Sequence, residues 1–259
     1  MDRNYFDLKD NVAIVTGCSG GLGVQMAKAL ASQGASIVAV ARRKERIEAV
    51  ANQIAEEFGV PTFAVQCDIK STDAVDAMVD AVIEKFGRID ILINNAGTGA
   101  IGNAEDITDE QFENEMQIDL FGSFRVARAV AKKAMIPAKY GRIINIASMY
   151  GLVGNMVAGS TPYHAAKGGV VNMTRALAAE WGKHGITVNA IGPGLFESEM
   201  TASTLFRSEE FLAAYNALNP AGRPGGRGEL NGTVLYLSCD ASSYVQGQLI
   251  LVDGGATLV

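Results

Sequence analysis

The chain is poor in cysteine, in excess basic charge and in long apolar runs, and each shortage excludes a class of protein. Its three cysteines, Cys18, Cys67 and Cys239, are odd in number and widely spaced, so they form neither a disulfide framework nor a metal-ligand pattern. No apolar run is long enough to span a bilayer, and residues 1–8 lack a signal-peptide core. We expect a cytoplasmic protein with no membrane partner and no metal.

The charge balance is mildly acidic. The formal net charge of −6 argues against nucleic acid or an anionic membrane as the partner. The hydrophobic content of 48% over 259 residues is enough for a substantial core. We expect residues 1–259 to form a single domain that binds a small molecule.

Apolar runs alternate regularly with helical patterns along the chain. Strands are predicted at 12–16, 36–41, 62–66, 90–94, 142–147, 186–191 and 248–252, and helices at about 22–33, 43–58, 72–86, 109–135, 163–183 and 227–238. Such alternation is typical of an α/β fold: a doubly wound, Rossmann-type sheet of about seven mostly parallel strands with helices on both faces. Residues 192–226 hold much of the Gly and Pro and are expected to form an irregular substrate loop.

A glycine-rich turn follows the first strand. The segment from Thr16 to Gly23 reads TGCSGGLG and precedes a helical pattern, which is the setting of a dinucleotide site. Glycine allows the backbone to approach a pyrophosphate, and the helix N-terminus supplies N–H groups. Because the spacing is Gly-x-x-x-Gly-x-Gly, a purely structural glycine turn remains the alternative.

Tyr163 and Lys167 are spaced to share one face of a helix that begins near Pro162. An ammonium beside a phenol lowers the phenol's pKa, so the pair can serve in acid–base catalysis. The alternative is a tyrosine packed in the core beside a lysine that extends to solvent.

Together with four further motifs, these two segments resemble the short-chain dehydrogenases/reductases over nearly all of residues 12–255. The four are NNAG at 94–97, INIAS at 144–148, VNAIGPG at 188–194 and VDGG at 252–255. Two further stretches, 172–181 and 193–201, look most like gluconate 5-dehydrogenases and related ketone or polyol reductases.

The resemblance implies an oxidoreductase that moves hydride between a nicotinamide cofactor and a secondary alcohol or ketone. Tyr163 would be the acid/base, Lys167 would lower the pKa of Tyr163 and hold the ribose, and Ser148 would bind the substrate oxygen. Ser148 could instead merely cap its own backbone. The positions implied to bind the cofactor are Gly17, Ser19, Gly20, Gly21, Leu22, Gly23, Arg42, Arg43, Asp68, Ile69, Asn95, Ala96, Gly97, Tyr163, Lys167, Pro193, Gly194, Phe196 and Ser198.

Asp119 departs from the family pattern, because an asparagine that supports the lysine through water usually occupies this position. An ionised carboxylate accepts hydrogen bonds but donates none, and its charge would raise the pKa of Lys167. We expect Asp119 to shift the pH profile. A structural aspartate bound to backbone N–H groups is the alternative.

Cofactor preference depends on the end of the second strand. An acidic residue there binds the ribose of NAD, whereas a basic one accommodates the 2′-phosphate of NADP. Ala41 is followed by Arg42 and Arg43, so NADP(H) is favoured over NAD(H). The alternative for the arginines is a solvated start of the next helix, and for Asp68, which resembles the adenine-binding residue, a strand-end cap.

The substrate is less defined. The expected walls are apolar, which favours a bulky ketone over a sugar acid, although the stripe could equally be core or interface. They comprise Met149, Tyr150, Leu152, Val153, Met156, Val157, Leu195, Phe196, Met200, Leu205, Phe206, Phe211 and Tyr215, with Arg207 nearby. A 3-oxoacyl thioester reductase, a hydroxysteroid dehydrogenase, an enzyme of another class on this fold and a non-catalytic nucleotide-binding subunit are the alternatives.

Assembly is predicted from the helix that begins at Tyr163. Its apolar residues Val170, Val171, Met173, Leu177, Ala178 and Trp181 spread over more than one stripe, so one face could meet a partner. Because related enzymes are commonly homotetramers, we expect a homotetramer, or failing that a dimer.

Overall fold

The protein is built on one seven-stranded parallel sheet, seen in a computed structural model that describes residues 4–99, 101–154, 159–202 and 205–258, without the side chains of 199 and 200. The strand order is β3-β2-β1-β4-β5-β6-β7. The strands are β1 (Val12–Thr16), β2 (Ser36–Ala41), β3 (Thr62–Gln66), β4 (Ile91–Asn94), β5 (Gly141–Ile146), β6 (Ile186–Pro193) and β7 (Leu249–Val252). The predicted fold class is confirmed, and every strand pair is parallel.

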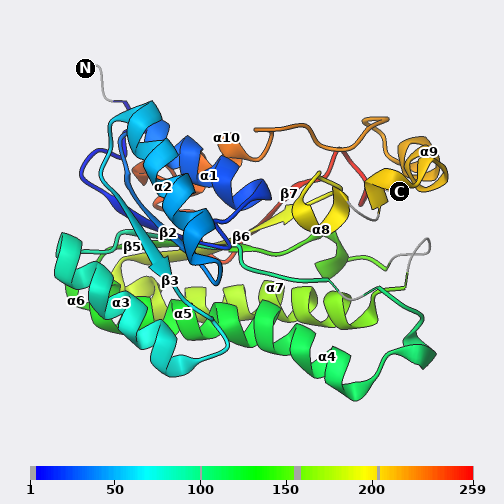
Figure 1. Ribbon diagram of the computed structural model, residues 1–259, viewed down its shortest axis with the longest axis horizontal. Coiled ribbons are helices and arrows are strands. Elements are labelled where there is room, and N and C mark those ends of the chain that lie inside the picture. The colour runs from blue at the N-terminus through cyan, green and yellow to red at the C-terminus, as the bar shows by residue number, and fades with distance from the viewer. Residues whose placement is uncertain (1–3, 100, 155–158, 203–204, 259) are drawn as a thin grey trace.

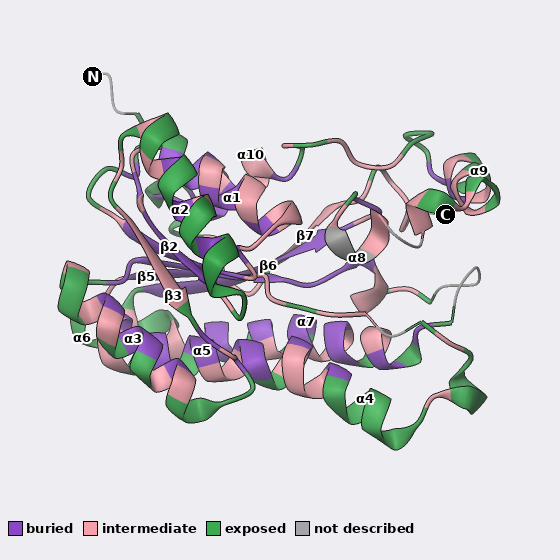
Figure 2. Ribbon diagram, viewed as in Figure 1, coloured by how far each residue is buried: buried purple, intermediate pink, exposed green. Residues whose placement is uncertain are grey.

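The central strands are continuous apolar runs because both faces of the sheet are covered. All residues of β1, β4, β5 and β6 are buried. Figure 2 shows these strands as a buried layer between helices whose outer surfaces are exposed.

Two helical layers enclose the sheet (Figure 1). One layer contains α1 (Gly21–Ser32), α2 (Lys44–Phe58) and α10 (Asn231–Ser238). The other contains α3 (Thr72–Phe86), α5 (Ser123–Val130) and α7 (Thr161–Trp181). Five of the six predicted helices have nearly the predicted bounds.

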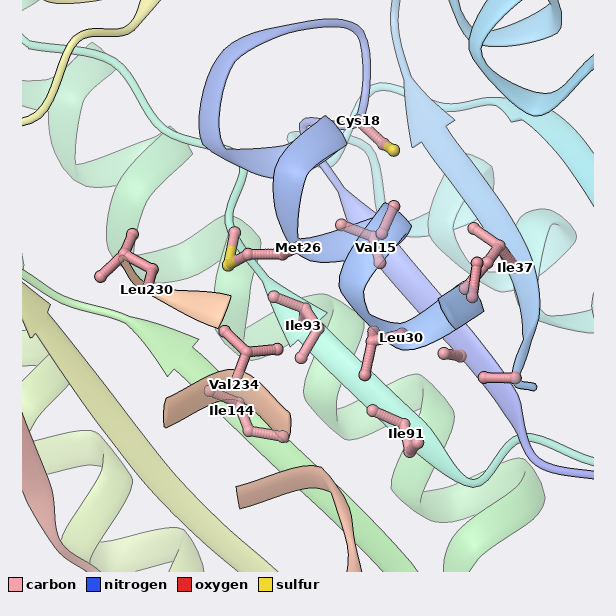
Figure 3. Packing of buried hydrophobic residues seen from close by; sticks show 14 of the residues in the cluster. Val15, Cys18, Met26, Leu30, Ile37, Ile91, Ile93, Ile144, Leu230 and Val234 are labelled. Atoms are coloured by element: carbon pink, nitrogen blue, oxygen red, sulfur yellow. The ribbon is translucent and has the colours of Figure 1, made fainter. Parts of the chain in front are cut away.

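The core of the first layer joins helices that are far apart in the sequence. Met26 and Leu30 of α1, Val234 of α10 and Ile93 of β4 lie in one buried cluster (Figure 3). Apolar burial of this kind is the main favourable term in folding and holds α1 against the sheet.

The predicted helix 109–135 is one continuous helical run, residues 109–138, that changes between α- and π-helical turns. It consists of α4 (Asp109–Glu115), the π-helical segment η2 (Met116–Gly122), α5, a second π-helical segment η3 (Ala131–Met135) and α6 (Ile136–Ala138). Asp119 lies in η2. Wider π-helical turns are rare and occur frequently at functional sites, and no sequence signal predicted them.

The prediction of an irregular stretch at 192–226 is wrong in part. It contains α8 (Glu199–Ala202), the 3₁₀ turn η6 (Leu205–Arg207) and the ten-residue α9 (Glu209–Leu218). The Ser208 hydroxyl caps α9 by accepting from the N–H of Phe211. The cap and the apolar spacing Phe211, Leu212, Tyr215 are a start signal that the Gly and Pro content obscured.

No helix among residues 4–99, 101–154, 159–202 and 205–258 has the length and apolarity needed to cross a membrane. The three cysteines are buried and free.

Candidate active site

The glycine turn after β1 has no room for larger side chains. A Cβ at Gly23 would lie 2.5 Å from the carbonyl oxygen of Gly17, and Gly17 itself has a φ of +68°. Only glycine therefore allows the loop to fold back on the first turn of α1. The N-cap is Gly20, whose missing side chain leaves the first N–H groups of α1 facing the loop. This geometry fits a pyrophosphate.

The turn lies where the sheet reverses its strand order, since β1 is flanked by β2 and β4. Ligands of doubly wound sheets bind at this switch point. The Thr16 hydroxyl accepts from the N–H groups of Asn95 and Ala96, and Asn95 Nδ2 donates to the carbonyl oxygen of Thr16. These bonds hold residues 95–97 against the glycine turn.

Tyr163 and Lys167 lie on one face of α7, as predicted. The Nζ atom of Lys167 is 5.4 Å from the centroid of the Tyr163 ring and donates to the carbonyl oxygen of Ile146 at 3.0 Å. The Ser148 side chain hydrogen-bonds Tyr163, and it also accepts from the N–H of Tyr150 at 3.1 Å. Ser148 thus has both its expected position beside Tyr163 and the backbone-capping contact given as the alternative.

Asp119 makes a direct ion pair with Lys167. Its Oδ1 is 2.8 Å from Lys167 Nζ, and its Oδ2 accepts from the N–H of Thr98 at 2.9 Å. Both charged side chains are buried. Gly97 makes the approach feasible, because a Cβ there would lie 2.6 Å from Asp119 Oδ1. The hydrogen bond from Thr98 matches the alternative of a structural aspartate. Asp119 therefore both places a negative charge beside Lys167 and binds a backbone N–H.

These contacts set the protonation of the pair. The pKa of Tyr163 is raised, first by burial and further by Asp119, while Lys167 and the hydrogen bond from Ser148 act to lower it. Burial acts to lower the pKa of Lys167, but Asp119, Tyr163 and Glu115 outweigh it and the pKa is raised. Lys167 is therefore an ammonium and Tyr163 a neutral phenol at neutral pH.

One cavity of about 500 Å³ joins the glycine turn to Ser148, Tyr163 and Lys167. Every residue predicted to bind a cofactor lines it. Asp119 is not among its lining residues and lies behind Lys167. Lining residues that were not predicted as site residues include Thr98 and Ile101, which come from an irregular segment without a motif, and Thr201, which lies in the short helix α8.

Three charged side chains gather at the end of the cavity near β2. Arg42 and Arg43 follow β2, and Arg43 donates to the Ser19 hydroxyl at 2.7 Å across the glycine turn. Asp68 lines the cavity while its Oδ1 accepts from the N–H of Lys70. The arginines thus line the cavity and also directly precede α2. Asp68 lines the cavity as predicted, and it also makes the strand-end capping contact that was the alternative interpretation.

The opposite end is apolar. Met149, Tyr150, Leu195, Phe196 and Leu205 line it as predicted. Phe206, Phe211 and Tyr215 pack behind Met149 and Leu195 as a second layer. Leu152 and Val153 are not lining residues, which corrects the predicted wall. Met156 and Val157 lie outside the described residues, as does the side chain of Met200.

Comparison with known proteins agrees with this geometry. The family model described as enoyl-(acyl carrier protein) reductase matches residues 17–257. The chain is 38% identical to (2S)-[(R)-hydroxy(phenyl)methyl]succinyl-CoA dehydrogenase subunit BbsD of Thauera aromatica, over 97% of this chain and 98% of that protein. It is also 38% identical to gluconate 5-dehydrogenase of Gluconobacter oxydans (strain 621H), over 98% of each chain.

Among solved structures, a gluconate 5-dehydrogenase from Burkholderia cenocepacia J2315 in complex with NADP and tartrate aligns with a TM-score of 0.94. It is 34% identical, over 99% of this chain and 98% of that one. The chain belongs to the short-chain dehydrogenase/reductase family. It is accordingly an oxidoreductase that acts on CH–OH groups, which confirms the predicted class.

Proposed function

We propose that the protein is an NADP(H)-dependent carbonyl reductase and secondary alcohol dehydrogenase in which Tyr163 moves the proton. The observation that carries this is the shared cavity, in which Tyr163, Lys167 and Ser148 lie at one end and the glycine turn with Arg42 and Arg43 at the other. The solved relative that binds NADP supports the same choice of cofactor. When bound, the nicotinamide group supplies or accepts the hydride.

Each side chain has a separate task. The Tyr163 hydroxyl gives a proton to the carbonyl oxygen in reduction and takes one from the alcohol in oxidation. Ser148 hydrogen-bonds the same substrate oxygen and Tyr163. Lys167, held by Asp119 and the carbonyl of Ile146, keeps a positive charge near the phenol and opposes the rise in its pKa. Asp119 acts through Lys167 and is a positioning residue.

The cofactor end fits a phosphorylated dinucleotide. Arg42 is exposed at the rim of the cavity, and Arg43 is fixed over the turn by Ser19. Guanidinium groups bind phosphate through charge-assisted hydrogen bonds. Ala41 has no group that could bind the ribose hydroxyls of NAD. Arg42 and Arg43 therefore select the 2′-phosphate.

The test is Tyr163→Phe, which removes the hydroxyl and keeps the ring. We expect turnover to fall by roughly 100- to 10,000-fold, the usual contribution of general acid–base catalysis. NADPH binding, followed by the cofactor's fluorescence, should be retained. Tyr244→Phe is the control, because Tyr244 is fully exposed. Undiminished turnover in Tyr163→Phe would refute the mechanism.

We also propose a homotetramer, on grounds that differ from the sequence argument. Val170, Val171, Leu177 and Ala178 are buried within the chain, so they do not form a second apolar stripe. The exposed residues of α7 include three alanines, Ala165, Ala176 and Ala179, beside the polar Thr161, Asn172, Arg175 and Glu180. Small exposed residues allow two helices to approach closely. Light scattering at micromolar concentration should return the mass of four chains, and a monomer mass would contradict the proposal.

Location in the cytoplasm is likewise proposed. Cys18, Cys67 and Cys239 are all free and buried, which suits a reducing compartment. Fractionation of the source cells, with the protein traced by antibody, is the check.

A further inference from the structure

Among the residues that the structure describes, the substrate end of the cavity has no cation that could pair with an acidic substrate. Of the residues that line the cavity, those with charged side chains are Arg42, Arg43, Asp68 and Lys167. The first three lie at the cofactor end. Lys167 is committed to Asp119 and to the carbonyl of Ile146. Arg207, the basic residue closest in sequence to the lining Leu205, is exposed and is not itself a lining residue.

The polar groups at this end are neutral hydroxyls. Burial raises the pKa of Tyr150 to about 12, so its hydroxyl stays protonated. The Thr201 hydroxyl donates to the carbonyl of Phe196, and Ser160 is within 3.2 Å of His164 Nδ1. The hydroxyls of Thr201 and Ser160 are thus engaged within the chain.

The remaining surface is apolar and backed by a second apolar layer. Met149 and Leu195 are buried, and they pack with Leu205, Phe206 and Tyr215. The rings of Phe211 and Tyr215 stack with centroids 6.4 Å apart, which stiffens this wall. A carboxylate placed here would lose its water and gain no partner, which is costly.

On the basis of the proposed reductase function, we propose that this site accepts uncharged, apolar ketones and secondary alcohols, aromatic or alicyclic, and rejects sugar acids and other carboxylates. The assignment departs from the sugar acids implied by likeness to gluconate dehydrogenases. It rests on the apolar residues that line the substrate end of the cavity. An enzyme discriminates against a substrate whose charged group would be buried there without a partner.

The experiment uses a pair of ketones that differ in one charge and one methyl group, away from the reacting carbonyl: methyl 4-acetylbenzoate and 4-acetylbenzoate. With NADPH and the full-length protein, we expect kcat/KM for the ester to exceed that for the acid by on the order of 100-fold, the usual effect of an unpaired charged group. Equal or faster turnover of the acid would overturn the proposal.

A binding measurement separates this proposal from the catalytic one. The alcohols that correspond to the two ketones cannot react with NADPH, so calorimetry on the NADPH-loaded protein reports affinity alone. Tighter binding of the ester supports the substrate class even if no ketone is turned over, which would refute only the reductase function. Equal binding, or binding of the acid alone, overturns the substrate class.

A charge introduced in the wall should reverse part of the selectivity. Leu205→Arg places a cation in the lining and is expected to narrow the ester-to-acid ratio in affinity and in kcat/KM by at least tenfold. Leu218→Arg, at the exposed end of α9, is the matched control and should leave the ratio unchanged. An unchanged ratio in a Leu205→Arg variant that still binds NADPH would contradict the proposal.

Discussion

The ion pair between Asp119 and Lys167 should contribute strongly to stability, and Asp119→Asn tests it. The substitution preserves the size of the side chain and an acceptor for the N–H of Thr98, and it removes the charge. Two unit charges 2.8 Å apart attract by about 6 kcal/mol at an effective dielectric constant of ~20. Desolvation of both ions offsets much of this while the pair is intact.

Removing one partner leaves Lys167 buried with an uncompensated charge, and breaking a buried pair in this way typically costs about 3–5 kcal/mol. We expect about 3 kcal/mol for Asp119→Asn, because the amide still accepts from Thr98. At roughly 2–4 °C per kcal/mol for a domain of this size, the melting temperature should fall by about 6–12 °C. Calorimetry at pH 7 is the assay.

The effect has a defined pH dependence. In the wild type the pKa of Lys167 is raised above its unfolded value of 10.5, so its contribution is complete below pH 10.5 and is lost as the pH rises through the folded pKa. In the Asp119→Asn variant the carboxylate of Asp119 no longer opposes the effect of burial, so the pKa of Lys167 in the folded state falls. The cost of burying its charge is then relieved as the pH rises and Lys167 loses its proton. The stability difference between the two proteins should therefore narrow from pH 7 toward pH 10.

An exposed pair supplies the control. Asp80 and Lys133 are 2.9 Å apart, and the Asp80 side chain is 65% exposed. Surface pairs contribute about 0–1 kcal/mol, so Asp80→Asn should change the melting temperature little. If Asp119→Asn were no more destabilising than Asp80→Asn, the argument from burial would be refuted.

Three other predictions concern the cofactor, the pH profile and a glycine. NADPH should exceed NADH at least tenfold in kcat/KM, since a hydrogen bond to a charged group contributes roughly 1.5–3 kcal/mol; Ala41→Asp with Arg42→Leu should reverse the order in a steady-state assay. Because the pKa of Tyr163 is raised, ketone reduction should stay level through neutral pH and fall only at alkaline pH, while alcohol oxidation rises with pH; the opposite limbs would contradict this. Gly232→Ala should stabilise α10 by about 0.5–1 kcal/mol, since a Cβ there contacts nothing within 4 Å.

The sequence predicted closely the strands and the residues that line the glycine-turn end of the cavity, because both depend on local rules. A buried parallel strand must be apolar along its whole length, as Val12–Thr16 is. Gly17 and Gly23 are required where the turn meets α1, so the spacing could be recognised without coordinates. The same holds for Tyr163 and Lys167, since helical spacing alone places both on one face.

The substrate end was predicted less completely because its residues come from segments with no shared spacing. Ile101, Ser160 and Thr201 line the cavity and come from three separate places: an irregular stretch, the N-cap of α7 and the four-residue helix α8. The π-helical segments depend on tertiary packing, which a periodic pattern does not reveal. The high Gly and Pro content of 192–226 also concealed α9, although Ser208 and the residues after it form a regular helix start.

For Asp119, the sequence predicted the direction of the charge effect on Lys167 correctly but not the direct contact between the two side chains. The sequence indicated an added negative charge near Lys167, and the raised pKa of Lys167 agrees with it. It did not reveal that the carboxylate reaches the ammonium directly, which depends on the missing side chain at Gly97 and on the bond from Thr98. Because the pair is direct, Lys167 has no charge to offer a substrate carboxylate. The feature that departs from the family pattern thus bears on both proposals, the proton transfer at Tyr163 and the selection of an uncharged substrate.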